Sequence, residues 1–127
     1  MSSVYLKDCE KDLAEKYIAL LHDFRENHPG YDLQITCTHR SAKEQMELYA
    51  IGRSKPGQIV TQIDGVKKMS NHNFMPSRAL DVAVLIHGKI TWDEEAYKPL
   101  VALAEKHGLV SGGSWKTFKD YPHLELP

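Results

Sequence analysis

The sequence contains few cysteines and no long run of apolar residues. Two cysteines in 127 residues, Cys9 and Cys37, exclude a disulfide-rich scaffold and a four-cysteine zinc site. Every apolar run is far shorter than the roughly 20 residues of a membrane helix, so we expect no membrane insertion. The N-terminus lacks the basic start and the apolar stretch of a secretion signal, which predicts that no signal peptide is present.

The chain also lacks a strong charge bias. Its formal net charge is -1, from 16 basic and 17 acidic side chains, whereas nucleic-acid-binding domains are usually more basic. We therefore expect no nucleic-acid partner. One segment, residues 53–78, is locally positive, which is typical either of a solvated loop or of a surface that attracts an anionic substrate. Its basic residues are Arg53, Lys55, Lys67, Lys68 and Arg78, opposed by Asp64 alone.

Hydrophobic spacing predicts a mixture of helices and strands without regular alternation, which favours the α+β class. The expected helices cover residues 10–26, 42–51 and 94–107. The expected strands cover residues 33–37, 79–86, 90–92 and 123–126. Residues 53–80 read as one irregular connection, and a connection of that length in a small domain is usually functional.

Asp81 is the first chemical anomaly, because it lies in an otherwise apolar predicted strand. A buried carboxylate is costly unless it is paired or bound to a metal. His72 lies nine residues upstream, across a loop, and His123 lies near the other end of the chain. Two imidazoles and one carboxylate suffice for a catalytic zinc ion with an open position, but this spacing does not by itself make them converge.

The segment from Ser70 to Asp81 reads S-N-H-N-F-M-P-S-R-A-L-D. It resembles the zinc motif of the peptidoglycan-cleaving metallopeptidases, which include D-alanyl-D-alanine carboxypeptidases and phage L-alanyl-D-glutamate endopeptidases (endolysins). The common family motif is shorter between its histidine and its aspartate, and Met75 stands where its glycine would fall. Three further segments resemble the family in the same order, so the resemblance covers about residues 32–127. They are residues 38–50, 52–61 and 113–125.

This resemblance implies a fold and a set of roles. It implies one compact domain over residues 1–127, with a small antiparallel sheet flanked by helices, as in hedgehog and DD-peptidase domains. No residues would remain for a separate wall-binding domain. The zinc ligands would be His72, Asp81 and His123. Asp120 would be the general base, and Arg40 would stabilise the oxyanion.

The resemblance also points to two polar substrate contacts, and several roles keep an ordinary structural alternative. The substrate contacts would be Ser70 and Gln45. Asp120 could cap a turn, and Arg40 could pair with a glutamate on the following helix. Glu125 shares a strand face with the last histidine and could be a base or could orient that imidazole. Arg78, inside the motif, could pair with the motif's aspartate.

The predicted function is a phage-type endolysin that cuts the peptidoglycan stem peptide between L-alanine and D-glutamate by a zinc-activated water. We expect a monomer whose partner is bacterial peptidoglycan. It would be made in the host cytoplasm and reach the wall after the membrane is permeabilised. Two alternatives remain open. One is a D-alanyl-D-alanine carboxypeptidase with the same metal centre, and the other is an inactive, zinc-stabilised binding domain.

Overall fold

The computed structural model describes residues 2–117 and 119–127. The described chain has three α-helices and a five-stranded sheet, which confirms the α+β class. The helices are α1 (Lys11–Asn27), α2 (Ala42–Ala50) and α3 (Glu94–Lys106). The strands are β1 (Tyr31–Cys37), β2 (Ala79–Ile86), β3 (Lys89–Thr91), β4 (Val110–Ser111) and β5 (His123–Glu125). Short 3-10 turns cover Leu6–Asp8, Asn71–Asn73 and Gly112–Ser114.

The sheet is antiparallel and is built around β2. Its order is β1-β2-β5-β4, and β3 returns beside β2 through a tight hairpin. The two hairpin residues, His87 and Gly88, both have positive φ, as the favoured two-residue turn requires. The register places Asp81 of β2 opposite His123 of β5 on one side and Cys37 of β1 on the other. Two chain segments that are distant in sequence therefore meet at one point of the sheet.

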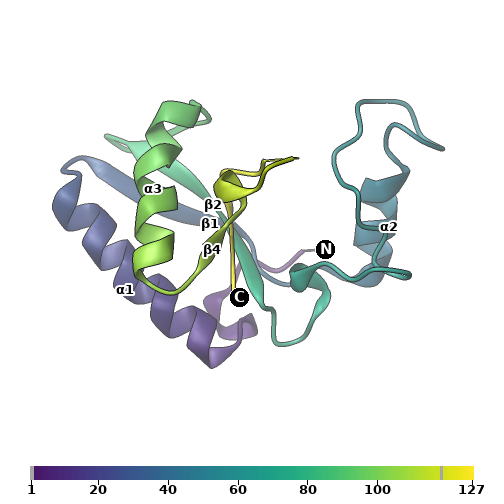
Figure 1. Cartoon of the computed structure of the whole chain (residues 1–127), viewed down its shortest axis with the longest axis horizontal. Coiled ribbons are helices and arrows are strands. Elements are labelled where there is room, and N and C mark those ends of the chain that lie inside the picture. Colours follow the sequence, from purple (N-terminus) through teal and green to yellow (C-terminus); the bar gives the residue numbers. More distant parts are fainter. Residues whose placement is uncertain (1, 118) are drawn as a thin grey trace.

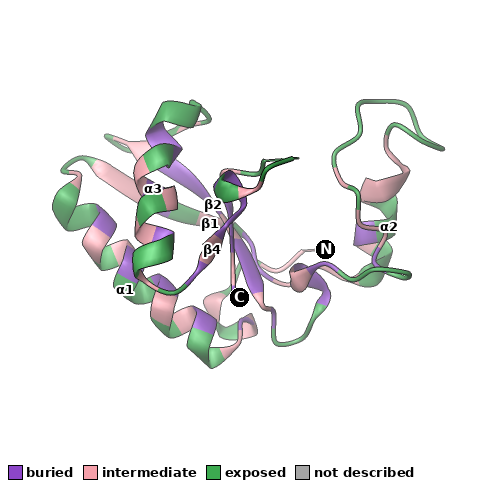
Figure 2. Ribbon diagram, viewed as in Figure 1, coloured by how far each residue is buried: buried purple, intermediate pink, exposed green. Residues whose placement is uncertain are grey.

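The core lies between the sheet and the two longer helices. Figure 1 shows α1 and α3 side by side against the sheet, and Figure 2 shows their inner faces buried. Every fourth or third residue of α1 is buried, from Leu13 through Leu20 to Phe24, as an amphipathic helix predicts. Burial of one such side chain stabilises the fold by about 1.5–3 kcal/mol. The core therefore makes β2 a rigid base for Asp81.

The helix α2 lies apart from this core. Figure 1 shows it beyond the far end of β2, followed by the long connection that returns to Asn71–Asn73. Ser41 is the N-cap of this helix, because its side chain accepts a hydrogen bond from the Glu44 amide. The molecule thus has a packed half and an arm, and α2 forms the arm. None of the helices in the described ranges has the length and apolarity needed to cross a bilayer.

Candidate active site

Three atoms from three segments converge where β2 meets β5. His72 Nε2 lies 3.2 Å from Asp81 Oδ1 and 3.2 Å from His123 Nδ1, and the latter two atoms are 3.1 Å apart. Asp81 and His123 are neighbours because their strands are paired in that register. His72 reaches them from the turn Asn71–Asn73, and all three side chains are largely buried. The three residues predicted from sequence are therefore brought together.

The turn that carries His72 is held by local hydrogen bonds. The Ser70 hydroxyl accepts from the His72 amide, and the Asn73 side chain accepts from the Ser70 amide, which closes a capping box. The Asn73 amide group donates to the Arg40 carbonyl, and the Arg40 amide donates to the His72 carbonyl. The segment around Arg40 and the histidine turn are thus held together by hydrogen bonds. The loop between His72 and Asp81 accommodates the residues by which this motif exceeds the common family motif.

The outer nitrogens of the two imidazoles have acceptors of their own. His72 Nδ1 lies 2.6 Å from the Thr38 carbonyl oxygen, and His123 Nε2 lies 2.6 Å from Glu125 Oε1. Both partners only accept hydrogen bonds, so each outer nitrogen carries the proton in the neutral ring. The two inner nitrogens then present lone pairs toward Asp81. Three electron-pair donors aimed at one point require a cation between them, so this donor set fits a metal ion.

The size of the triangle also fits such an ion. Bonds of 2.0–2.1 Å to nitrogen and oxygen at tetrahedral angles place neighbouring ligand atoms about 3.3 Å apart. The three observed separations of 3.1–3.2 Å are close to that value. Cys37 lies on the outer side of His72, with Sγ 3.7 Å from Nδ1, the nitrogen that faces away from the triangle. We therefore take the two histidines and the aspartate, without the cysteine, as the candidate metal ligands.

In the metal-free chain, burial and hydrogen bonding together determine the protonation of the three candidate metal ligands. Burial lowers the pKa of His72, but its hydrogen bonds to Asp81 and Cys37 outweigh burial and raise the pKa to about 10. Burial likewise lowers the pKa of His123, and its bonds to Asp81 and Glu125 raise it to about 8. Burial raises the pKa of Asp81, but the two histidines hold it well below its usual range. Protons on the imidazoles thus supply the positive charge in the metal-free chain.

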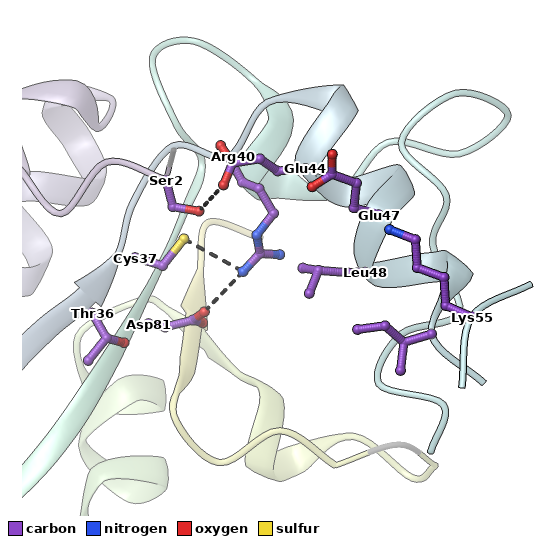
Figure 3. Close-up of a pocket in the computed structure, with 10 residues that line it drawn as sticks. Ser2, Thr36, Cys37, Arg40, Glu44, Glu47, Leu48, Lys55 and Asp81 are labelled. Carbon is purple, nitrogen blue, oxygen red and sulfur yellow. Dashed lines mark hydrogen bonds and ion pairs between the residues drawn. The ribbon is translucent and has the colours of Figure 1, made fainter. Parts of the chain in front are cut away.

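Arg40 lies at the edge of the triangle. One guanidinium nitrogen donates to Gln45 Oε1 at 3.0 Å, and the other lies 3.7 Å from Asp81 Oδ2 and 3.6 Å from Cys37 Sγ. Figure 3 shows the guanidinium pointing between Cys37 and Asp81. Within the described part of the chain Arg40 pairs with Asp81 and Gln45 and not with Glu44, which accepts a hydrogen bond from the Ser2 hydroxyl. The arginine is thus oriented toward the candidate metal ligands.

Gln45 is buried beneath this arginine, with 1% of its surface exposed. Its carbonyl oxygen accepts from Arg40, while its amide nitrogen donates to the Ile63 carbonyl at 2.9 Å and to the Thr61 hydroxyl at 3.3 Å. Gly65 packs against the Gln45 side chain so closely that an added Cβ would lie 2.9 Å from Gln45 Cβ. Gln45 therefore links Arg40 to the long connection.

Asp120 lies beside Asp81 and His123. One carboxylate oxygen of each aspartate and one ring nitrogen of the histidine all lie within 4.8 Å of one another. Its backbone forms a turn, because the Asp120 carbonyl accepts from the His123 amide. A side chain at Gly112 would collide with the Asp120 carbonyl, which explains the glycine there. Restricted hydration of the carboxyl, together with the charge of Asp81, raises the pKa of Asp120.

These groups open into a groove of about 500 Å³. Its polar floor contains the three candidate metal ligands with Arg40 and Asp120, and its walls come from the long connection and from the segment before β5. The wall residues include Val60, Thr61, Gln62, Ile63, Trp115 and Lys119. A second cavity of similar volume lies on the other side of Arg40 and Leu48, shares Asp81 with the groove and extends to Lys55, as Figure 3 shows.

Two further side chains lie beside the site, and one prediction from sequence is wrong. Glu125 contacts the last histidine, which is the arrangement that the orienting alternative requires. Trp115 lines the groove, with its ring centroid 5.1 Å from that of His123. Arg78 does not contact the motif's aspartate, because its guanidinium faces outward and pairs with Glu10 at 3.2 Å.

The positive segment contributes less to the site than expected. Its five basic side chains are absent from the described lining of the groove around His72, and Lys55 lines only the second cavity. Arg53 lies over the Tyr49 ring and donates to the Tyr49 carbonyl. Sequence reasoning missed two residues of the site. The Thr38 carbonyl is a backbone group that no side-chain pattern reveals, and Lys119 could have been found only from its position beside Asp120.

Comparison with known proteins finds similarity to peptidases that act on peptidoglycan. The sequence profile of a family described as D-alanyl-D-alanine carboxypeptidase matches residues 64–126. The peptidoglycan L-alanyl-D-glutamate endopeptidase CwlK of Bacillus subtilis (strain 168) is 41% identical over 76% of this chain. The chain spans 62% of the length of that relative.

The fold is also found among solved structures. The crystal structure of the L-Ala D-Glu endopeptidase ChiX of Serratia marcescens matches with a TM-score of 0.67. This match covers 96% of the present chain and 83% of that one, at 23% identity, and shows a shared fold. The motifs, the converging residues and the 41% identical relative lead to one conclusion: the chain is similar to the peptidoglycan-cleaving peptidases.

Proposed function

We propose that this chain is a zinc-dependent endopeptidase that cuts the stem peptide of bacterial peptidoglycan between L-alanine and D-glutamate. The observation that carries the proposal is the triangle of His72, Asp81 and His123, set between a guanidinium and a carboxylate at the floor of an open groove. A purely structural metal site needs neither of those two flanking groups. The specificity is taken from the 41% identical endopeptidase.

The metal role follows from the donor set. Two neutral imidazoles and a carboxylate, with room left for a further ligand, are typical of catalytic zinc. Zinc held there would supply a water whose pKa is lowered toward about 7. Thr38 and Glu125 hold the proton on the outer nitrogen of each ring, so that the inner nitrogens stay free to coordinate.

Asp120 is proposed as the general base. Its carboxylate lies beside Asp81 and His123, on the groove side of the triangle. The raised pKa of Asp120 suits a group that accepts a proton from water and then donates it to the leaving amine. This proton shuttle needs no covalent bond between the chain and the substrate.

Arg40 is proposed to stabilise the oxyanion that develops on the scissile carbonyl. Its guanidinium is fixed by Gln45 on one side and by Asp81 on the other, so it is oriented before the substrate arrives. Ser70 and Gln45 both line the groove and are proposed to contact the substrate. Their own hydrogen bonds give them a further role, which is to hold His72 and Arg40 in place.

A D-alanyl-D-alanine carboxypeptidase is the second candidate, because the matching family carries that description. Mass spectrometry of purified peptidoglycan after digestion separates the two. New N-terminal D-glutamate on the stem supports the endopeptidase, whereas free D-alanine supports the carboxypeptidase. Absence of both products would favour an inactive zinc-stabilised domain. The phage origin and the endolysin role rest on the sequence resemblance and stay predictions.

A further inference from the structure

We infer that Lys119 determines specificity by binding the free α-carboxylate of the glutamyl residue on the leaving side of the scissile bond. This inference rests on the proposed function. The glutamyl residue of a stem peptide is joined onward through its γ-carboxyl group, so its α-carboxylate remains charged. That carboxylate is attached to the same Cα as the scissile nitrogen. Covalent geometry therefore places its carbon about 2.5 Å from that nitrogen.

This carboxylate must lie close to Asp120. A group that protonates the leaving amine has to approach the scissile nitrogen to roughly 2.6–3.2 Å. The substrate carboxylate and Asp120 are then held within a few ångströms of each other, and Asp81 adds a third negative charge nearby. Like charges this close repel strongly in a partly desolvated groove. Productive binding therefore calls for a cation on the Asp120 side.

Lys119 is the side chain that meets this requirement. It precedes Asp120 directly, and both residues line the groove. Its ammonium group makes no ion pair with any described residue. Arg40, the other permanently charged cation among the described lining residues, is already bonded to Gln45 and lies near Asp81. The ammonium group of Lys119 is compact and lies at the end of a flexible chain, so it can follow a carboxylate without fixed geometry.

Two synthetic peptides test the inference. One is L-alanyl-γ-D-glutamyl-L-lysine, and the other carries D-isoglutamine, so that the α-carboxylate becomes a neutral amide of nearly the same shape. The zinc-loaded chain is assayed on both peptides, as wild type and as Lys119→Gln and Lys119→Arg. Lys116→Gln is the matched control, because Lys116 is also exposed but does not line the groove.

We expect wild type to prefer the acidic peptide by roughly tenfold in kcat/KM, the effect of one charged hydrogen bond in a partly exposed groove. Lys119→Gln should abolish or reverse this preference, mainly through KM, because the carboxylate then lies near Asp120 and Asp81 without a compensating cation; cleavage of the amidated peptide should be unchanged. Lys119→Arg should retain the preference, and Lys116→Gln should behave as wild type.

Two results would overturn the assignment. One is that wild type cleaves both peptides equally well, and the other is that Lys119→Gln slows both to the same extent. Failure of wild type to cleave either peptide would instead overturn the proposed function, and the role of Lys119 with it.

Discussion

The two acids beside His123 should respond to substitution in opposite ways. Glu125 Oε1 accepts from His123 Nε2 at 2.6 Å, and only 21% of the Glu125 side chain is exposed, so solvent weakens this bond little. Glu125→Gln keeps an acceptor but removes the charge. A charged hydrogen bond exceeds a neutral one by about 1–1.5 kcal/mol, which corresponds to roughly tenfold in affinity. We therefore expect zinc affinity to fall about tenfold in Glu125→Gln and up to about a hundredfold in Glu125→Ala.

Asp120→Asn should show the reverse pattern. Its carboxylate is proposed to transfer a proton, so we expect kcat at saturating zinc to fall by about a hundredfold or more. Zinc affinity should stay within a few-fold of wild type. Competition with a chromophoric chelator measures the affinity, and cleavage of a stem peptide in excess zinc measures kcat.

An exchange of the two phenotypes would contradict the assignment of Asp120 as the base and of Glu125 as the residue that orients His123. An Asp120→Asn enzyme that remains active, beside a Glu125→Gln enzyme that binds zinc normally but is inactive, would make Glu125 the base. A loss of zinc in Asp120→Asn would instead make Asp120 a metal ligand. Circular dichroism of each variant checks that the fold is intact.

Three further outcomes follow from the structure. The folded-state pKa values of His72 and His123, about 10 and 8, lie above the ordinary value of 6.5. The stability that these imidazoles contribute to the metal-free chain is therefore complete below pH 6.5 and is lost as the pH rises through 8 toward 10. Thermal unfolding of the chelated chain should show a falling Tm over that range, while the zinc-bound chain, whose imidazoles must be neutral, should not. Arg40→Lys should lower kcat by about a hundredfold, since one ammonium cannot contact both partners of the guanidinium, and steady-state kinetics checks this. Replacing Lys67 and Lys68 with Gln should weaken pelleting with cell walls and flatten its salt dependence without changing kcat on a small peptide, and identical pelleting curves would exclude a wall-binding role.

Most of the regular fold could be predicted from the sequence, because its helices and strands carry clear apolar periodicity. The helix α1 and the strand β2 lie within one or two residues of their predicted bounds. The two-residue strand β4 was not predicted, since Val110–Ser111 is too short to show a pattern and pairs only through tertiary contact with β5. The spacing of apolar residues along the chain does not predict a strand that forms only by pairing with a distant segment.

The candidate site was predicted less completely than the fold. Motif resemblance identified His72, Asp81 and His123, and the register between β2 and β5 explains why the last two meet. The hydrogen bond to the Thr38 carbonyl could not be predicted, because any residue offers the same backbone group. Arg78 points outward toward Glu10 because of the way the loop after the histidine turn folds. The sequence of the motif does not specify the conformation of that loop.

The most direct test of the central claim is a zinc titration of the metal-stripped chain, read as cleavage of purified peptidoglycan. If His72, Asp81 and His123 form one catalytic metal site, activity should rise in proportion to added zinc and level off at about one equivalent per chain. The product should be stem peptide with new N-terminal D-glutamate, and His123→Ala should stay inactive at the same zinc concentrations. Full cleavage by the metal-stripped chain, or by His123→Ala, would contradict the account.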